Sequence, residues 1–133
     1  MRFVVLLLFI GLMLSVAVPN GAAQDRDVVK SIERALNKGD VPGLLAFGSD
    51  RIAVAVFGEA REYSHSQAEY VLKDFFKTHR VTSFSFDDRS QTDRGMFVQG
   101  RLRYRGADEP LQVFVRLRMR SDEWELREII IRK

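Results

Sequence analysis

The sequence predicts an α+β domain in which N-terminal helices pack on one face of a curved antiparallel sheet. In the first part of the chain apolar residues recur mostly at helical spacing, and after residue 80 their period changes to two. The segments with a period of two are joined by short polar stretches, which is typical of consecutive strands in an antiparallel meander. Helices that precede a block of hairpin-connected strands favour the α+β class.

The first 23 residues have the pattern of an export signal. Arg2 precedes an uncharged apolar run over residues 3–18, which Pro19 interrupts, and Gly21 and Ala23 are small residues at the −3 and −1 positions of a cleavage site. The run is shorter than the about 20 apolar residues that a spanning helix needs, and an uncleaved anchor is the alternative. We expect a signal peptide over 1–23, a single domain over 24–133, no membrane span after cleavage, and a periplasmic or secreted location.

The composition limits the classes of function. Removing 23 of the 133 residues leaves 110, enough for one domain with one core. Removal of Arg2 leaves 20 of the 21 Lys and Arg against 18 Asp and Glu, so the net charge of the domain is +2. This small excess does not indicate a nucleic-acid partner. The chain has no cysteine, which excludes disulfides, thiolate metal ligands and thiol chemistry.

Two helices and a strand are expected before residue 64. Residues 27–38 have one apolar stripe, with Asp27 as the N-cap and Gly39 as the stop, and Asp40 can cap a short helix over 41–47. The β-branched segment 51–58 suits a buried strand, and residues 59–63 follow as a turn with a short partner strand.

The segment 64–78 predicts a third helix that is held by packing. Ser64 and Gln67 form a capping box, which satisfies two backbone donors at the helix start. Glu69 and Lys73 are spaced i, i+4 in the favourable order. A full apolar stripe is expected to face the core, comprising Ala68, Val71, Leu72, Phe75 and Phe76.

Four strands are expected over 81–90, 96–105, 110–120 and 123–132. On the second and third of them, residues of one parity are apolar and should face the helices. These are Met96, Val98, Leu102 and Tyr104, then Leu111, Val113, Val115, Leu117 and Met119.

The order of elements and two local motifs resemble a known family. The motifs are the helix end formed by Ala35, Leu36, Gly39 and Asp40, and the helix start formed by Tyr63, Ser64, Ser66 to Glu69 and Val71 to Phe76. With them the chain resembles the nuclear transport factor 2-like superfamily of α+β cones, and more closely the bacterial family called domain of unknown function 4783, over roughly residues 27–131.

This resemblance implies a fold and no particular reaction. Members of the wider superfamily include isomerases, dehydratases and epoxide hydrolases that use an Asp or a His inside the cone, together with modules that only bind ligands or dimerise through their sheets. Fold likeness does not choose between an enzyme and a binder.

The two histidines are candidates for chemistry, but their spacing separates them. In one helix, His65 and His79 lie about 21 Å apart along the axis at ~1.5 Å per residue, so they cannot share a metal ion or a proton. The sequence contains no metal-binding pattern, and we expect neither a metal nor a cofactor. His65 beside Tyr63 could act as a base or bind a ligand at the mouth of the cone; the alternative is an exposed residue at a helix start.

Asp88 is the second catalytic candidate. It has the parity of Phe84 and Phe86, so in a regular strand it would point into the cone, where superfamily enzymes keep a general base. The alternative is a solvated residue at the strand end.

Arginines and aromatic residues suggest binding surfaces. Phe97 and Phe114 lie among six outward-facing arginines that could bind an anionic surface, pair with acids such as Glu125, or support a homodimer through the sheet. The arginines are Arg101, Arg103, Arg105, Arg116, Arg118 and Arg120. Residues that could line a small pocket are Tyr63, Tyr70, Tyr104 and Trp124.

These observations favour an exported module that binds a small ligand or a protein without catalysis. Two alternatives remain: a cone-pocket enzyme of the isomerase, dehydratase or hydrolase type that uses His65 or Asp88, and a module that binds anionic surfaces through its arginines.

Overall fold

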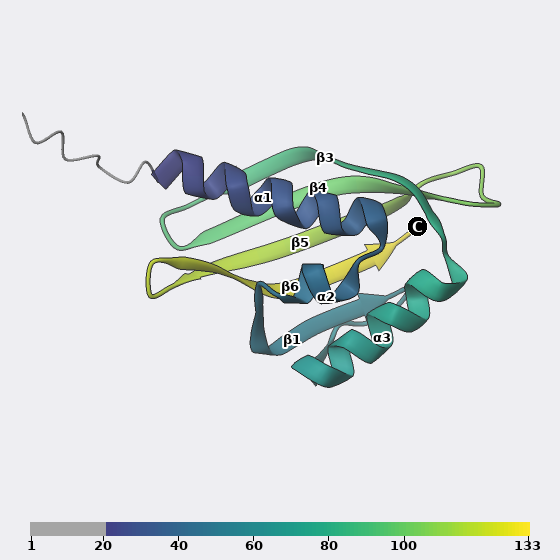
Figure 1. Ribbon diagram of the computed structural model, residues 1–133, viewed down its shortest axis with the longest axis horizontal. Coiled ribbons are helices and arrows are strands. Elements are labelled where there is room, and N and C mark those ends of the chain that lie inside the picture. Colours follow the sequence, from purple (N-terminus) through teal and green to yellow (C-terminus); the bar gives the residue numbers. More distant parts are fainter. Residues whose placement is uncertain (1–20) are drawn as a thin grey trace, which may run out of the picture.

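The computed structural model describes residues 21–133, so the predicted signal peptide lies almost entirely outside the described residues. In these residues, three helices and six strands form one α+β unit (Figure 1). In chain order the elements are α1 (Gly21–Lys38), α2 (Val41–Leu45), β1 (Gly48–Val56), β2 (Arg61–Ser64), α3 (His65–Thr78), β3 (Val81–Gln91), β4 (Gly95–Tyr104), β5 (Leu111–Arg120) and β6 (Glu123–Arg132).

The strands form one sheet in the order β2-β1-β6-β5-β4-β3. The expected meander of β3 to β6 is confirmed, and the short partner strand β2 pairs with β1. The sheet is mixed rather than wholly antiparallel, because β1 runs parallel to β6. Parallel neighbours require a long connection, and here β2, α3 and β3 to β5 lie between the two strands in the chain.

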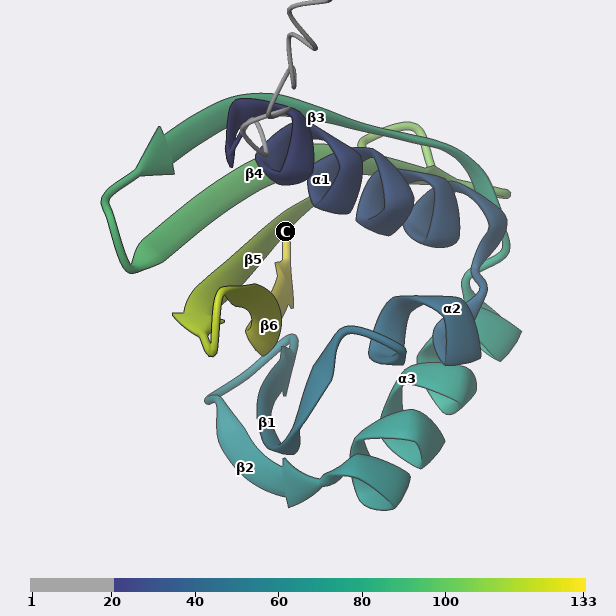
Figure 2. The ribbon, with the colours of Figure 1, turned by 60° about the vertical axis from the view of Figure 1, so that its left-hand side comes forward.

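All three helices lie on the concave side of the curved sheet, as Figure 2 shows. α1 packs along β3, while α3 packs against β1 and α2 lies between the two longer helices. The core between these layers is mostly aliphatic. Its largest fully buried side chains are Ile32, Leu36, Leu44, Leu45, Ile52, Leu72, Met96, Leu102, Leu117, Leu126, Ile129 and Ile131.

The helix ends follow the predicted capping rules with one exception. Ser64 and Gln67 form both halves of the capping box of α3, and Asp40 accepts a hydrogen bond from Gly43 N. Gly39 has φ +64°, a conformation that glycine adopts without steric cost. The prediction that Asp27 caps α1 is wrong, because that helix begins at Gly21. The preceding residues contain alanine, Gln24 and Arg26, which are good helix formers.

A β-bulge bends β3 in its middle. Phe86 pairs with Gly100 of β4 and Asp88 with Gln99, so Asp87 is an extra residue in the ladder. A Cβ on Gly100 would lie 2.8 Å from the Phe84 ring, and closer still to the Ser85 carbonyl oxygen. The two strands can approach this closely only because Gly100 has no side chain.

Side chains of α1 hold the open edge of the sheet at β3. The amide of Phe84 donates to Asn37 Oδ1 at 2.9 Å, and the amide of Phe86 donates to Glu33 Oε2 at 2.8 Å. Further along the same helix, Gln91 Nε2 donates to Asp25 Oδ2 at 2.7 Å. Because these three helix residues are spaced in multiples of four, they share one face of α1. α1 thereby covers the edge of β3, where backbone amides would otherwise be unpaired.

Asp25 also connects α1 to β6. Its Oδ1 accepts a hydrogen bond from Trp124 Nε1 at 2.6 Å, and Arg89 lies 3.9 Å from Oδ2. The hydrogen bond from Gln91 is the main cause that lowers the pKa of Asp25 below its ordinary value of 3.8. Burial opposes this shift, and the Trp124 bond and the Arg89 charge act in the same direction as Gln91.

The predicted stripe of α3 can be tested by truncation of its largest buried ring. Phe75 is 3 % exposed, so Phe75→Ala should lower the free energy of unfolding by about 3–5 kcal/mol, because the change removes apolar contacts and leaves a cavity. Urea unfolding measures this difference. A loss below ~1 kcal/mol would mean that the ring does not belong to the core.

The Asp25 contacts predict an acid-dependent component of stability. Because the native pKa is lower than the unfolded one, the contribution of the charged form is complete above about pH 4 and is lost as the pH falls through the native pKa. Asp25→Asn should therefore be less stable than the wild type at pH 7, and the difference should shrink below pH ~4. Urea unfolding across this range checks it; a difference that does not change with pH would contradict the assignment.

Candidate functional site

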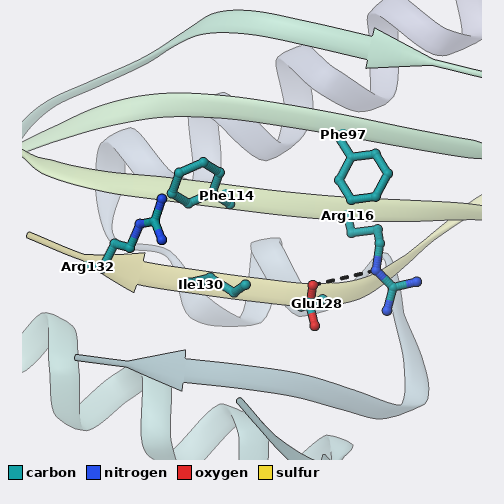
Figure 3. Close-up of a pocket in the computed structure, with 6 residues that line it drawn as sticks. All are labelled: Phe97, Phe114, Arg116, Glu128, Ile130 and Arg132. Carbon is teal, nitrogen blue, oxygen red and sulfur yellow. Dashed lines mark ion pairs between the residues drawn. The ribbon is translucent and has the colours of Figure 1, made fainter. Parts of the chain in front are cut away.

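Several hollows on the described part of the chain combine aromatic and charged side chains, and two of them are the candidate sites. The first, the outer-face hollow, lies on the sheet surface turned away from the helices and has a volume of about 170 Å³. Its lining residues are Phe97, Phe114, Arg116, Glu128, Ile130 and Arg132 from β4, β5 and β6, as Figure 3 shows.

Apolar side chains form the centre of the outer-face hollow and charged ones lie around it. Phe97 is 57 % exposed, and Phe114 and Ile130 are half-buried. The guanidinium carbon of Arg132 lies 4.5 Å from the centroid of the Phe114 ring, a cation–π contact. Arg116 pairs with Glu128 at 3.6 Å, the dashed contact in Figure 3. The hollow is smaller than the ~300 Å³ at which small-molecule pockets begin.

The second hollow, the mouth hollow, has a volume of about 410 Å³ and lies between the start of α1, the α2–β1 connection and the start of β6. The start of α1 and the β5–β6 hairpin lie at the same end of the molecule (Figure 1). Its lining residues are Gln24, Asp27, Val28, Ser31, Ala46, Phe47, Glu123 and Trp124.

Local structure positions the mouth residues. The β5–β6 turn has positive φ at Ser121 (49°) and Asp122 (63°), as in a type I′ hairpin, and it leads directly into Glu123 and Trp124. The Trp124 indole is fixed by its hydrogen bond to Asp25, and the Phe47 carbonyl accepts the amide of Leu126 at 2.7 Å. Both aromatic residues are thus attached to neighbouring elements, Trp124 to α1 and Phe47 to β6.

His65 lies at the first residue of α3 and forms a structural contact. Its Nε2 is 2.8 Å from the carbonyl oxygen of Leu45, so this nitrogen carries the hydrogen and donates it. The bond ties the start of α3 to the end of α2. Tyr63 is half-buried nearby in sequence and lines a separate hollow with Tyr70. A catalytic role for His65 stays a prediction.

Asp88 lies on the outer face, so the expectation that it points into the cone is wrong. The bulge at Asp87 reverses the alternation of side chains, and Asp88 pairs across the ladder with the outward-facing Gln99. Asp88 is exposed and borders a shallow outer hollow of about 70 Å³ beside Phe97. A catalytic role in the cone would therefore require a different residue.

The four predicted pocket residues do not converge on one site. Trp124 lines the mouth hollow, whereas Tyr63 and Tyr70 line a hollow of about 300 Å³ on α3. Tyr104 meets His79 edge-on at 5.0 Å. His79 also stacks on Phe75 at 4.4 Å with an angle of 13°, and its Nδ1 lies 3.0 Å from the Phe75 carbonyl oxygen.

Three of the six arginines on the outer strands form ion pairs with neighbouring acids. Arg101 pairs with Asp87 at 3.1 Å, and Arg120 pairs with Glu125 at 3.6 Å, the acid that the sequence indicated. The third pair joins Arg116 and Glu128. The outer face therefore carries charges of both signs.

The mouth hollow contains residues that sequence reasoning did not identify as a site. Asp27, Phe47 and Glu123 come from three separate segments, and no local motif connects them. Within residues 21–133, no group of three or more His, Asp or Glu side chains is arranged to hold a metal ion. None of the described helices has both the length and the apolar character needed to cross a membrane.

Comparison with solved structures supports the fold assignment. A domain of unknown function 4783 (DUF4783) protein from Bacteroides uniformis is 21 % identical, with 78 % of this chain and 94 % of that chain covered and a TM-score of 0.73. A DUF4783 protein from Bacteroides ovatus is 19 % identical, with coverage of 76 % and 90 % and a TM-score of 0.71. An NTF-2-like protein of unknown function from Shewanella oneidensis is 13 % identical, with coverage of 84 % and 98 % and a TM-score of 0.62.

No curated protein matches the chain. The family model of the domain of unknown function DUF4783 matches residues 29–132, which is most of the sequence. The fold is shared with nuclear transport factor 2-like proteins, as the resemblance implied. The chain therefore belongs to the DUF4783 family.

Proposed function

We propose that this protein is an exported binding module, without catalysis of its own, that pairs with a second copy of itself through the outer face of its sheet. The single observation that carries the proposal is the cluster of Phe97, Phe114 and Ile130 at the centre of that face. Aromatic residues and arginine are enriched at the cores of protein interfaces, with polar residues around them. Export is supported by the pattern of residues 1–23.

The charges of the face favour a second copy over a strongly charged partner. A two-fold interface brings the same surface of each copy together, so a face with one sign of charge would repel itself. This face carries Arg116 and Arg132 together with Glu128, and the Arg120–Glu125 pair lies further along the same strands. Two copies can then oppose arginine with glutamate.

The same ion pairs weigh against binding of anionic surfaces. A surface that binds polyanions presents an excess of unpaired cations, whereas three arginines of this face already have carboxylate partners. The small volume of the outer-face hollow suits a protruding side chain of a partner better than a free small molecule.

The proposal predicts a concentration-dependent dimer that depends on Phe97. Sedimentation equilibrium of the protein at high micromolar concentration should give the mass of a dimer. Phe97→Ser removes a ring that is more than half exposed, so the variant should fold normally while its dimer dissociation constant rises about 30-fold, as for a central interface residue.

Tyr70→Ser is the matched control, because Tyr70 is 76 % exposed on α3, away from the outer face. It should leave the dimer unchanged, and thermal melts of both variants test their folding. A wild-type monomer at high micromolar concentration, or a dimer that tolerates Phe97→Ser, would overturn the pairing.

The mass of the protein recovered from the periplasm tests export. We expect the mass of a chain that begins at Gln24.

A further inference from the structure

We propose that the mouth hollow binds a small organic cation that carries an apolar group. This site goes beyond the pairing proposed above, because the mouth and the outer face are lined by different residues. Its volume of about 410 Å³ lies within the range of ~300–1,000 Å³ that holds small molecules.

The lining determines the charge of the ligand. Asp27 and Glu123 are the charged side chains among the eight lining residues, and both are acidic. Neither of them takes part in an ion pair within residues 21–133, whereas the neighbouring Asp25 has Arg89 at 3.9 Å. A cation entering the hollow therefore meets two carboxylates, and an anion would be repelled.

The aromatic residues determine the second part of the ligand's chemistry. Phe47 and Trp124 line the hollow with Val28 and Ala46, so that its surface is mostly apolar away from the acids. The faces of aromatic rings attract ammonium groups, and the Trp ring does so most strongly. Aromatic residues are used in this way to recognise quaternary ammonium ligands. The indole N–H is already used by Asp25, which leaves the ring to contact a ligand without a polar atom to satisfy.

Two positive charges oppose a cation, and together they are smaller than the attraction. The start of α1 has a partial positive charge of about half a unit from the helix dipole. In an exported chain that begins at Gln24, the α-ammonium group of this lining residue adds about one unit. Asp27 on the helix and Glu123 on β6 carry two negative charges, while the charge of Asp25 is offset by Arg89. The two carboxylates therefore exceed the opposing charge.

Trp124 provides a specific reporter, because it is the single tryptophan of the chain. Titration with benzyltrimethylammonium should shift the Trp124 fluorescence and its indole N–H resonance in a saturable manner. Benzyl alcohol, a neutral analogue, should bind more weakly, and benzoate should not bind. Added salt should weaken binding of the cation.

Two variants test the assigned residues. Asp27→Asn and Glu123→Gln keep the shape and remove the charge, so each should weaken cation binding about two- to fivefold, the range for exposed charge pairs. Phe47→Leu should reduce the preference for the cation over benzyl alcohol. The matched control is Asp108→Asn on the β4–β5 turn, at the opposite end of the molecule, which should have no effect (Figure 1).

The proposal is overturned if the Trp124 signals do not respond to the cation, if benzoate or benzyl alcohol binds as well, or if the double variant Asp27→Asn with Glu123→Gln binds it unchanged. Phe97→Ser separates this site from the pairing surface. Cation binding should be the same in that variant, whether or not the wild type is a dimer.

Discussion

The attachment of α1 to the edge of β3 is the contact on which the arrangement of the other surfaces depends. The edge of a sheet presents unpaired amides, and here Asn37 and Glu33 accept two of them. These bonds place the helix along the strand and hold its first turns over the end of the sheet. Asp25, on the same side of the helix, can then reach both Gln91 and Trp124.

Two consequences follow for recognition. The β3 edge is covered by α1, and the opposite edge is formed by β2, a strand of four residues that begins with the exposed Arg61 and Glu62. Short charged edge strands resist the addition of another strand. Association through the convex outer face therefore fits this molecule better than pairing at an edge. The mouth hollow, in turn, depends on the position of α1, since two of its walls come from that helix and from the indole that Asp25 holds.

Much of the fold could be predicted because its signals are local. The capping box and the apolar stripe of α3 lie within one segment, and the alternation along β4 and β5 lies within single strands. The pairing of β3 to β6 as hairpins follows from the short turns that join these consecutive strands. The order of helices before hairpin-connected strands predicted helices on one face of a curved sheet, and the family resemblance implied the same fold.

The remaining features depend on contacts between distant residues. The parallel pairing of β1 with β6 joins segments that the pattern of either strand does not connect. The bulge at Asp87 is accommodated by the small Gly100 on the neighbouring strand, and it turns Asp88 to the outer face against its parity. The mouth site joins Asp27, Phe47 and Glu123 from three elements, so the sequence identified one of its aromatic residues, Trp124, and none of its acids.

Amide hydrogen exchange tests the attachment of α1 most directly. The amides of Phe84 and Phe86 should be strongly protected in the wild type, because each donates to a side chain of α1. Asn37→Ala should accelerate exchange at Phe84 more than at Phe86, and Glu33→Ala should do the reverse, so each variant is the control for the other. Wild-type amides that exchange as fast as those of an exposed strand edge, or variants that do not discriminate between the two positions, would contradict this account.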